Sequence, residues 1–242
     1  MPKQFEISTD SPADLNPALA RRHGVTCIPL SIHIDGRDFK DGVDITPAEM
    51  FKLSDAQKSV PKTSAVPVGD YMDVFSHLTA NGAEVLHISL GSHISSTHQN
   101  ALLASQEIPG VYVVDSDNLS CGISLLVYEA AALREAGFSA AETAAALEKI
   151  KGCVATGFVI DTLEYLRRGG RCSTLEALGA NLLGIKPSIE MSGGVLRVAK
   201  KYRGKSREVQ QKFIGDILAQ EEKIEPGRAV LCQTGVDADA FR

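Results

Sequence analysis

The chain lacks the features that mark membrane proteins, nucleic-acid-binding proteins and exported proteins. No run of residues reaches the roughly 18 apolar positions that a membrane helix requires, and no basic and then apolar leader opens the sequence. The net charge is −5, which argues against a broad nucleic-acid surface because such surfaces cluster Lys and Arg. We therefore expect a cytoplasmic protein with no stable membrane insertion and no nucleic-acid partner.

Metal-binding and disulfide patterns are lacking as well. The five cysteines are an odd number with no CxxC pair, so zinc sites and disulfide frameworks are poorly supported and reduced, buried thiols are expected. Asp10 and Asp115 each precede a serine at the end of a predicted strand, where they could act as acids. Each stands alone in its loop without a ligand histidine, so we expect no metal and no cofactor.

What is present is ordinary globular composition, 44% hydrophobic and 23% charged over 242 residues. Strand and helix patterns alternate through the first half, which predicts a mostly parallel sheet. The predicted strands are 3–9, 83–89 and 110–116, and the predicted helices that follow include 69–80, 97–106 and 119–137. A capping box at Ser139 and Glu142 predicts the start of another helix.

The pattern changes after about residue 152, which predicts a second and smaller mixed α/β lobe. Its predicted elements are a strand at 153–160, a helix at 174–183, a hairpin of strands 185–191 and 195–201, a helix at 206–222 and a strand at 228–233. We accordingly predict an N-terminal lobe over 1–154 and a C-terminal lobe over 155–242. Because the chain stops inside a strand–helix unit, we also expect it to be a fragment that lacks a C-terminal segment.

The segment "ISLGSHISSTHQNA" (88–101) carries five hydroxyl side chains between a predicted strand and a predicted helix. Helix N-termini and strand ends favour anions, and hydroxyls add neutral hydrogen-bond donors. With Thr63 and Ser64 from another loop, Ser95 and Ser96 predict a site for a carboxylate or a phosphate. The alternative is that Ser95 or Ser96 only caps the helix at 97–106.

A nucleophilic serine is the enzymatic alternative for the same loop. The G-x-S-x-G motif is absent, but His93 and His98 flank Ser95 and Ser96, which leaves open a serine hydrolase or a kinase-like phosphotransferase. Neighbouring positions in sequence rarely place an imidazole on an adjacent hydroxyl, and no third member of a triad is evident.

Two basic segments stand out further along the chain. "RVAKKYRGKSR" (197–207) lacks the glycine that a phosphate loop needs at position 199. As a basic surface it fits an acidic partner or a phosphate, and the alternative is a solvated helix start. In "YLRRGGRCS" (165–173), Arg171 follows a Gly-Gly pair, so it fits either helix-end carbonyls or a phosphate or carboxylate group.

Several of these motifs, in order along the chain, resemble the DegV family. "TDSPADL", "KTSAVPVGDY" and "HISSTHQNA" are similar to the family's "TDSTADL", "TSqPs..ey" and "LSGTYQSA". "FVIDTLEYLRRGGRCS" and "LLGIKPSIEMSGGVLRVAKKYRG" are similar to its later motifs, and the resemblance extends from residue 6 to about 207.

The resemblance implies a two-lobed α/β protein that binds a long-chain fatty acid between its lobes. It further implies a carrier rather than an enzyme, the fatty-acid-binding subunit of a bacterial fatty acid kinase, which presents the carboxylate to a separate ATP-binding subunit. The family's carboxylate-binding threonine and serine match Thr63 and Ser95. Its "GGR" and "KxRG" arginines match Arg171 and Arg203, which would face the kinase or the acyl phosphate.

This chain departs from the family pattern at three places. Ser96 replaces a glycine beside the binding serine, so its side chain either crowds the carboxylate or adds a hydroxyl, and His98 replaces the usual tyrosine. The family's "GxHxGPG" segment, whose histidine approaches the carboxylate, has no counterpart before residue 242.

Overall fold

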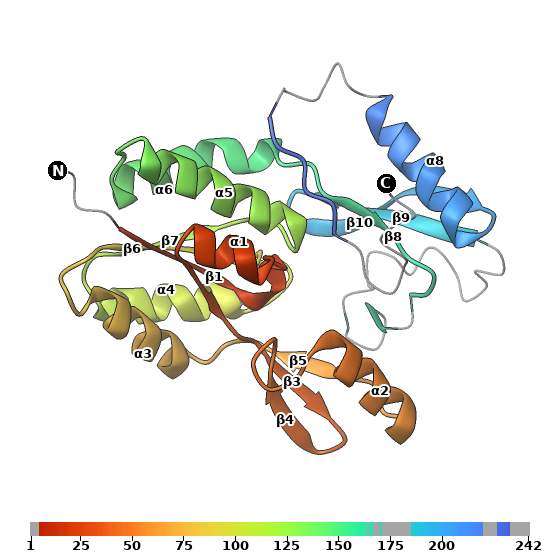
Figure 1. Ribbon diagram of the computed structural model, residues 1–242, viewed down its shortest axis with the longest axis horizontal. Helices are drawn as coiled ribbons and strands as arrows, with labels where there is room; N and C mark the ends of the chain where they lie inside the picture. Colours follow the sequence, from red (N-terminus) through yellow and green to blue (C-terminus); the bar gives the residue numbers. More distant parts are fainter. Residues whose placement is uncertain (1–4, 164, 167–169, 171–184, 220–226, 233–242) are drawn as a thin grey trace. The chain divides into compact units, whose positions relative to one another are not determined.

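The computed structural model describes residues 5–163, 165–166, 170, 185–219 and 227–232 (Figure 1). The chain divides into two compact units, Met1–Val154 and Ala155–Arg242. The first unit holds a parallel sheet and a small antiparallel sheet, and the second holds a separate antiparallel sheet. The predicted α/β fold, with a parallel sheet in its first part and a mixed second part, is confirmed.

The main sheet of the first unit has four parallel strands in the order β2-β1-β6-β7. The strands are β1 (Glu6–Asp10), β2 (Val25–Ile28), β6 (Val85–Ser89) and β7 (Val111–Asp115). Ile7 of β1 lies opposite Val25 on one side and Leu86 on the other. The two central strands therefore carry the core, and every residue of β6 is buried.

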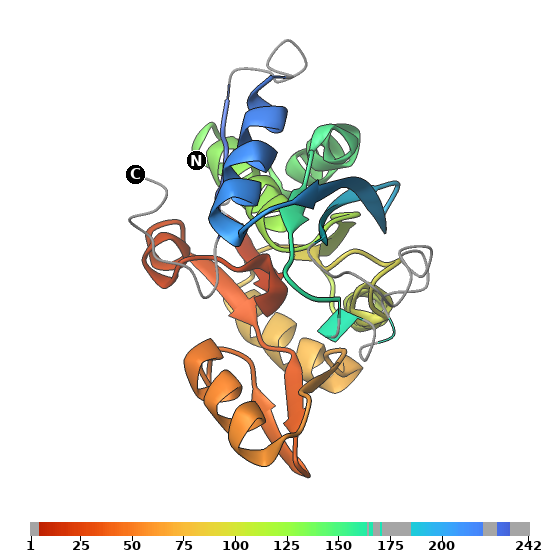
Figure 2. The same ribbon diagram turned by 90° about the vertical axis from the view of Figure 1, so that its right-hand side faces the viewer.

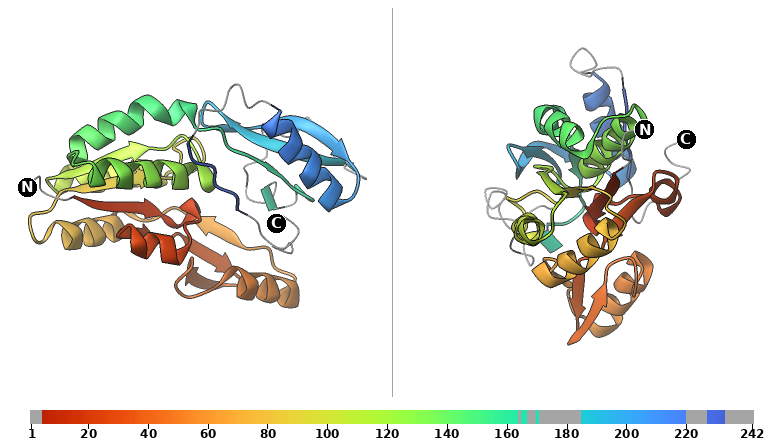
Figure 3. Two further views of the ribbon diagram at one scale, coloured as in Figure 1. Left: turned by 45° about the horizontal axis from the view of Figure 1, so that its top comes forward. Right: turned by 90° about the vertical axis from the view of Figure 1, so that its left-hand side faces the viewer.

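Helices cover both faces of this sheet (Figures 1 and 3). One face carries α3 (Val68–Thr79) and α4 (Thr97–Glu107), and the other carries α5 (Cys121–Glu135) and α6 (Ala140–Ile150). The short elements are α1 (Pro17–Arg22), beside β2, and the 3-10 turns η1 (Ser11–Ala13) and η2 (Lys151–Cys153). The capping box predicted at Ser139 and Glu142 is confirmed at the start of α6.

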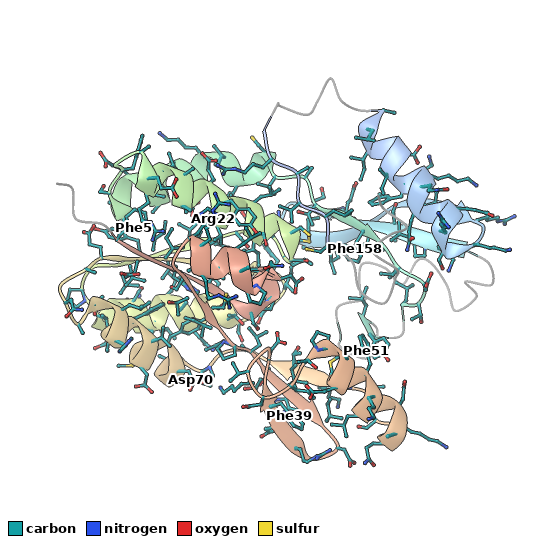
Figure 4. The ribbon with its side chains drawn as sticks, viewed as in Figure 1. Phe5, Arg22, Phe39, Phe51, Asp70 and Phe158 are labelled. Carbon is teal, nitrogen blue, oxygen red and sulfur yellow. The ribbon has the colours of Figure 1, made fainter. Side chains whose placement is uncertain are left out.

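A smaller antiparallel sheet in the order β4-β3-β5 lies beside helix α2 (Figure 2). Its elements are β3 (Ser31–Ile34), β4 (Arg37–Lys40), α2 (Pro47–Gln57) and β5 (Lys62–Ser64). Ile32 and Ile34 face the helix and form a separate apolar cluster with partly buried side chains that include Phe39, labelled in Figure 4. The sequence analysis did not predict α2 or β5, although Thr46 and Glu49 form a capping box at the start of α2.

In the described part of the second unit, three antiparallel strands form a sheet in the order β10-β9-β8, with α8 packed on it (Figure 3). Its elements are β8 (Gly157–Val159), β9 (Ile185–Ser192), β10 (Val195–Arg203) and α8 (Ser206–Leu218). The predicted hairpin is confirmed, and Gly193 and Gly194 turn it with φ of 58° and 75°. The strand predicted at 228–233 is wrong for residues 228–232, which form no ladder, and the predicted helix at 174–183 lies outside the described residues.

Candidate functional site

The carboxyl ends of β1, β6 and β7 lie at one edge of the four-stranded sheet. From β1 the sheet continues to β2 on one side and to β6 on the other, so a topological switch point lies between β1 and β6. Parallel α/β sheets bind ligands at such points, because the connections on the two sides leave in opposite directions. The last residues of these two strands are Asp10 and Ser89, and the predicted hydroxyl loop follows Ser89 directly.

Asp10 is fully buried at this switch point and is bound from several sides. Its Oδ2 accepts a hydrogen bond of 2.7 Å from the backbone N–H of Leu90, and its Oδ1 accepts one from the Tyr71 hydroxyl. The Nε2 atom of His87 lies 3.5 Å from the same Oδ1. A carboxylate held in this way anchors the start of the hydroxyl loop to β1, rather than meeting a substrate as an acid.

Tyr71 and His87 complete this buried network. Burial raises the pKa of the Tyr71 phenol far above its usual value, and the charge and hydrogen bond of Asp10 raise it further. Tyr71 is therefore a permanent donor to Asp10. His87 is fully buried, its Nδ1 lies 3.0 Å from Ser8 Oγ, and its ring packs edge-on against the Tyr71 and Phe75 rings. The network therefore ties β1, β6 and α3 together beneath the loop.

Asp115 anchors the same loop from the β7 side. Its Oδ1 accepts hydrogen bonds from the N–H of Ser92 at 3.1 Å and from the N–H of Asp117 at 3.0 Å. Burial acts to raise the pKa of Asp115, but the hydrogen bonds from Ser92 and Asp117 outweigh it and hold that pKa below its usual value. The loop after β6 is thus tied at residue 90 by one carboxylate and at residue 92 by another. The sequence placed both aspartates at strand ends but did not show this anchoring role.

Gly91, between these two anchors, packs against the loop that follows β7. Its N–H donates to Asn118 O at 2.9 Å, and its carbonyl accepts from the N–H groups of Ile94 and Ser95. A Cβ atom at Gly91 would lie 2.9 Å from the Asn118 backbone nitrogen. Only a glycine allows this close approach of the two loops, which in turn places Ser95.

Ser95 lies one residue before the N-cap of α4 and contacts the first residue of the helix. Its Oγ accepts from the Thr97 N–H at 3.2 Å and lies 2.6 Å from Thr97 Oγ1 at the start of α4. A hydroxyl has two acceptor positions and one proton. When Thr97 supplies both donors, the Ser95 proton is left to donate to an anion at the helix N-terminus, so the contact with Thr97 and anion binding are compatible.

The remaining polar residues of the loop do not form a Ser–His pair with Ser95. His98 Nδ1 bonds to Ser89 Oγ at 2.8 Å, and His93 is an exposed loop residue. Ser96 is the N-cap residue of α4, is exposed and makes no side-chain capping bond. The loop geometry therefore gives no support to a hydrolase that uses Ser95 or Ser96.

Thr63 is the middle residue of β5, three residues before Val66. The Nδ2 atom of Asn100, in the first turn of α4, donates to the Val66 carbonyl at 2.7 Å and ties the segment after β5 to that turn. The Thr63 hydroxyl is exposed and makes no side-chain hydrogen bond with another described residue. The Thr63 hydroxyl is therefore accessible to a ligand.

Ser64 lies on the other face of β5, because successive side chains of a strand alternate. Thr63 stands opposite Ile32, which faces α2, whereas Ser64 stands opposite Ser31. The Ser64 hydroxyl is bonded to His33 Nε2 at 2.9 Å. Ser95 and Ser96 therefore lie in the loop before α4, whereas Thr63 and Ser64 lie on opposite faces of β5.

His98 makes the stability of this site dependent on pH. Burial lowers the pKa of His98 from its usual value of 6.5. Below about pH 6.5 the unfolded chain takes up a proton that the folded imidazole resists, so the free energy of unfolding falls with falling pH. We expect His98→Asn to flatten this slope in urea titrations at pH 7.5, 6.5 and 5.5. An unchanged slope in His98→Asn would contradict the assignment.

The two predicted arginines belong to the second unit. Arg203 is exposed as the last residue of β10, and Arg171 lies outside the described residues. Lys201 is a second exposed cation on β10, while Lys200 pairs with Asp216 of α8 at 2.6 Å. Arg203 forms no ion pair with another described residue, and its exposed side chain can be reached by an anionic group.

Among the described residues, no group of three or more His, Cys, Asp or Glu side chains could hold a metal ion. No helix in the same residues is long and apolar enough to cross a bilayer.

The fold is thus a mixed α/β protein with a hydroxyl-lined loop at the switch point of a parallel sheet. Residues 4–242 match the family model described as "Uncharacterised protein, DegV family", and the chain belongs to that family. A DegV domain-containing protein of Caldanaerobacter subterraneus subsp. tengcongensis is 33% identical over 210 residues, covering 86% of this chain and 75% of the relative.

Solved structures share this fold. A DegV family protein of Thermus thermophilus, described as binding fatty acid, superposes with a TM-score of 0.80 at 32% identity, covering 90% of this chain and 78% of that one. The fatty acid kinase B3 protein of Streptococcus pneumoniae, loaded with linoleic acid, gives a TM-score of 0.76 at 23% identity over 89% of this chain and 79% of that one. At that identity the second likeness shows the fold alone.

Proposed function

We propose that this protein binds a long-chain fatty acid, with the carboxylate held by the hydroxyls of Thr63 and Ser95 and with Ser96 beside them. The observation that carries the proposal is the hydroxyl loop at the N-terminus of α4, anchored by carboxylates whose charges are already bonded to backbone N–H groups. Neutral donors and a helix N-terminus suit an anion and supply no base for hydrolysis. The fatty acid described for the Thermus thermophilus relative supports the same ligand class.

The acyl chain supplies most of the affinity in this proposal. Burial of an alkyl chain contributes about 0.8 kcal/mol per methylene, so some fifteen methylenes offer roughly 12 kcal/mol before the costs of ordering. A hydroxyl that donates to a carboxylate contributes about 1.5–3 kcal/mol and fixes which end of the acid faces α4. Toward the bound fatty acid, the protein then acts as a carrier that performs no chemistry at this site.

A kinase partner is the second part of the proposal. The protein presents the bound carboxylate to the ATP-binding subunit of a fatty acid kinase, and Arg203, with Arg171, faces that subunit or the acyl phosphate. Support comes from the exposed position of Arg203 on β10 and from the fold shared with a fatty acid kinase B3 protein. Arginine suits either the kinase subunit or the acyl phosphate, because its guanidinium pairs with carboxylates and with phosphates.

Loss of the two hydroxyls should weaken binding while the fold is kept. We expect Thr63→Ala and Ser95→Ala each to lower the affinity for oleate about tenfold, the lower end of the range for a charge-assisted hydrogen bond at a partly exposed site. The double variant should lose about a hundredfold if the two donors act independently. Native mass spectrometry with lipid extraction detects co-purified acid, and competition with a fluorescent fatty acid gives the affinities.

Ser76→Ala on α3, an exposed serine away from the loop, is the matched control and should keep full affinity. Full affinity in the double variant would reject the site assignment. An empty protein that takes up no added fatty acid would reject the ligand class. Transfer of phosphate from ATP to the bound acid by an added kinase subunit, reduced in Arg203→Ala, tests the partner role separately.

A further inference from the structure

Three side chains on three neighbouring strands of the small antiparallel sheet form a continuous hydrogen-bonded chain. Ser64 Oγ of β5 lies 2.9 Å from His33 Nε2 of β3, and His33 Nδ1 lies 2.5 Å from Asp38 Oδ1 of β4. The serine thus meets one ring nitrogen and the carboxylate meets the other. This is the order in which a carboxylate orients an imidazole that acts as base toward a serine hydroxyl.

The sheet register explains why these residues meet. Asp38 stands directly opposite His33 in the β3–β4 pair, and Ser64 stands two residues along β5 from Lys62, the residue opposite His33. All three side chains therefore lie on the face of the sheet that points away from Ile32 and α2. Because the contacts are fixed by strand pairing rather than by a flexible loop, the three groups are held in position before any substrate arrives.

We propose that Ser64 is a nucleophile activated by His33 and Asp38, and that it accepts acyl groups from soluble esters. This activity goes beyond fatty acid binding and uses the opposite face of β5 from Thr63. The three side chains are exposed, with 40% of the His33 side chain and 76% of the Asp38 side chain open to solvent. An acyl donor that approaches an open sheet face is a small soluble ester rather than a buried lipid.

The reaction is an acyl transfer in two balanced steps. Ser64 Oγ attacks the ester carbonyl carbon while its proton passes to His33 Nε2, and the bond to the leaving alcohol then breaks as His33 returns the proton to the alcohol oxygen. Water repeats the attack on the acyl-Ser64 ester with His33 as base and releases the carboxylic acid.

A fluorophosphonate probe tests the proposal directly on the intact protein. We expect one adduct per chain on Ser64, no adduct at that residue in Ser64→Ala, and labelling slowed about 100-fold or more in His33→Ala, the usual contribution of a general base. Asp38→Asn should slow labelling by a smaller factor, because Asp38 is largely exposed. Hydrolysis of p-nitrophenyl acetate should follow the same order among the variants.

Digestion must separate Ser64 from Ser95, since no Lys or Arg lies between Lys62 and Arg134 and trypsin leaves both serines on one peptide. Chymotrypsin, which cuts after Tyr71, places the two serines on different peptides. Ser31→Ala, which removes a serine on the same sheet face opposite Ser64, is the matched control and should label at the wild-type rate. Circular dichroism checks that each variant is folded.

No adduct on Ser64, an adduct on another serine, or labelling of Ser64 that is equally fast without His33 would overturn the proposal. The fatty acid proposal is tested on Thr63 and Ser95, so either proposal can fail while the other stands.

Discussion

Replacing Asp10 by alanine should lower the free energy of unfolding by about 3–5 kcal/mol, the range for removing one partner of a buried charged network. The substitution leaves the Tyr71 hydroxyl and the Leu90 N–H buried without their acceptor. Each unsatisfied buried polar group costs about 1–3 kcal/mol. Urea titration followed by circular dichroism measures the change.

Asp10→Ala should also weaken fatty acid binding, because the bond to Leu90 holds the start of the loop that carries Ser95. Asp73→Ala, an exposed aspartate of α3, is the matched control and should change stability by less than about 0.5 kcal/mol. Tyr71→Phe removes the hydroxyl that donates to Asp10, so it tests the same network without changing the carboxylate. If Asp10→Ala unfolds no more easily than Asp73→Ala, the buried network does not stabilise the protein in the way its geometry indicates.

Gly91→Ala should have the second large effect, a loss of about 1–3 kcal/mol of stability together with a loss of ligand affinity. The new Cβ would lie 2.9 Å and 3.0 Å from the backbone nitrogen and oxygen of Asn118, and 3.2 Å from the Asp117 carbonyl carbon. All three are backbone atoms, so relief requires one loop to move away from the other. Because the Gly91 carbonyl accepts from the Ser95 N–H, that movement carries the binding hydroxyl with it.

Gly69→Ala provides the matched control for this change. Gly69 lies in the first turn of α3, and a Cβ there would meet nothing within 4 Å. An alanine at such a position stabilises by about 0.4–1 kcal/mol, because it reduces the freedom of the unfolded chain. We therefore expect the two glycine substitutions to move the urea midpoint in opposite directions, and a Gly91→Ala protein with wild-type midpoint and oleate affinity would disprove the close-packing argument.

Much of the fold could be read from local sequence. The strand and helix patterns predicted β6, α4 and β7 to within two residues at each end, because a buried parallel strand and a capped helix both leave signals within a few residues. Helix α2 was missed although Thr46 and Glu49 form a capping box, since most of its residues are exposed and its apolar positions show little periodicity.

The candidate site was only partly readable, because its parts meet across long stretches of chain. The hydroxyl loop was visible as a local cluster, but the bond from Leu90 to Asp10 joins residues 80 positions apart. Strand β5 was read as a loop, so the opposite directions of Thr63 and Ser64 were not foreseen. Once β5 is known to be a strand, the alternation of its side chains separates the two residues.

By itself, the sequence determined the α/β class, the family resemblance and the position of the hydroxyl loop at a strand end. These depend on short-range patterns of hydrophobicity, capping and turn chemistry, which act within a few residues. Only the tertiary structure decided that Asp10 and Asp115 anchor that loop, and that Ser64 meets His33 rather than Ser95. Those contacts follow from strand order and register, which bring together residues far apart in the chain and are set by packing of the whole sheet.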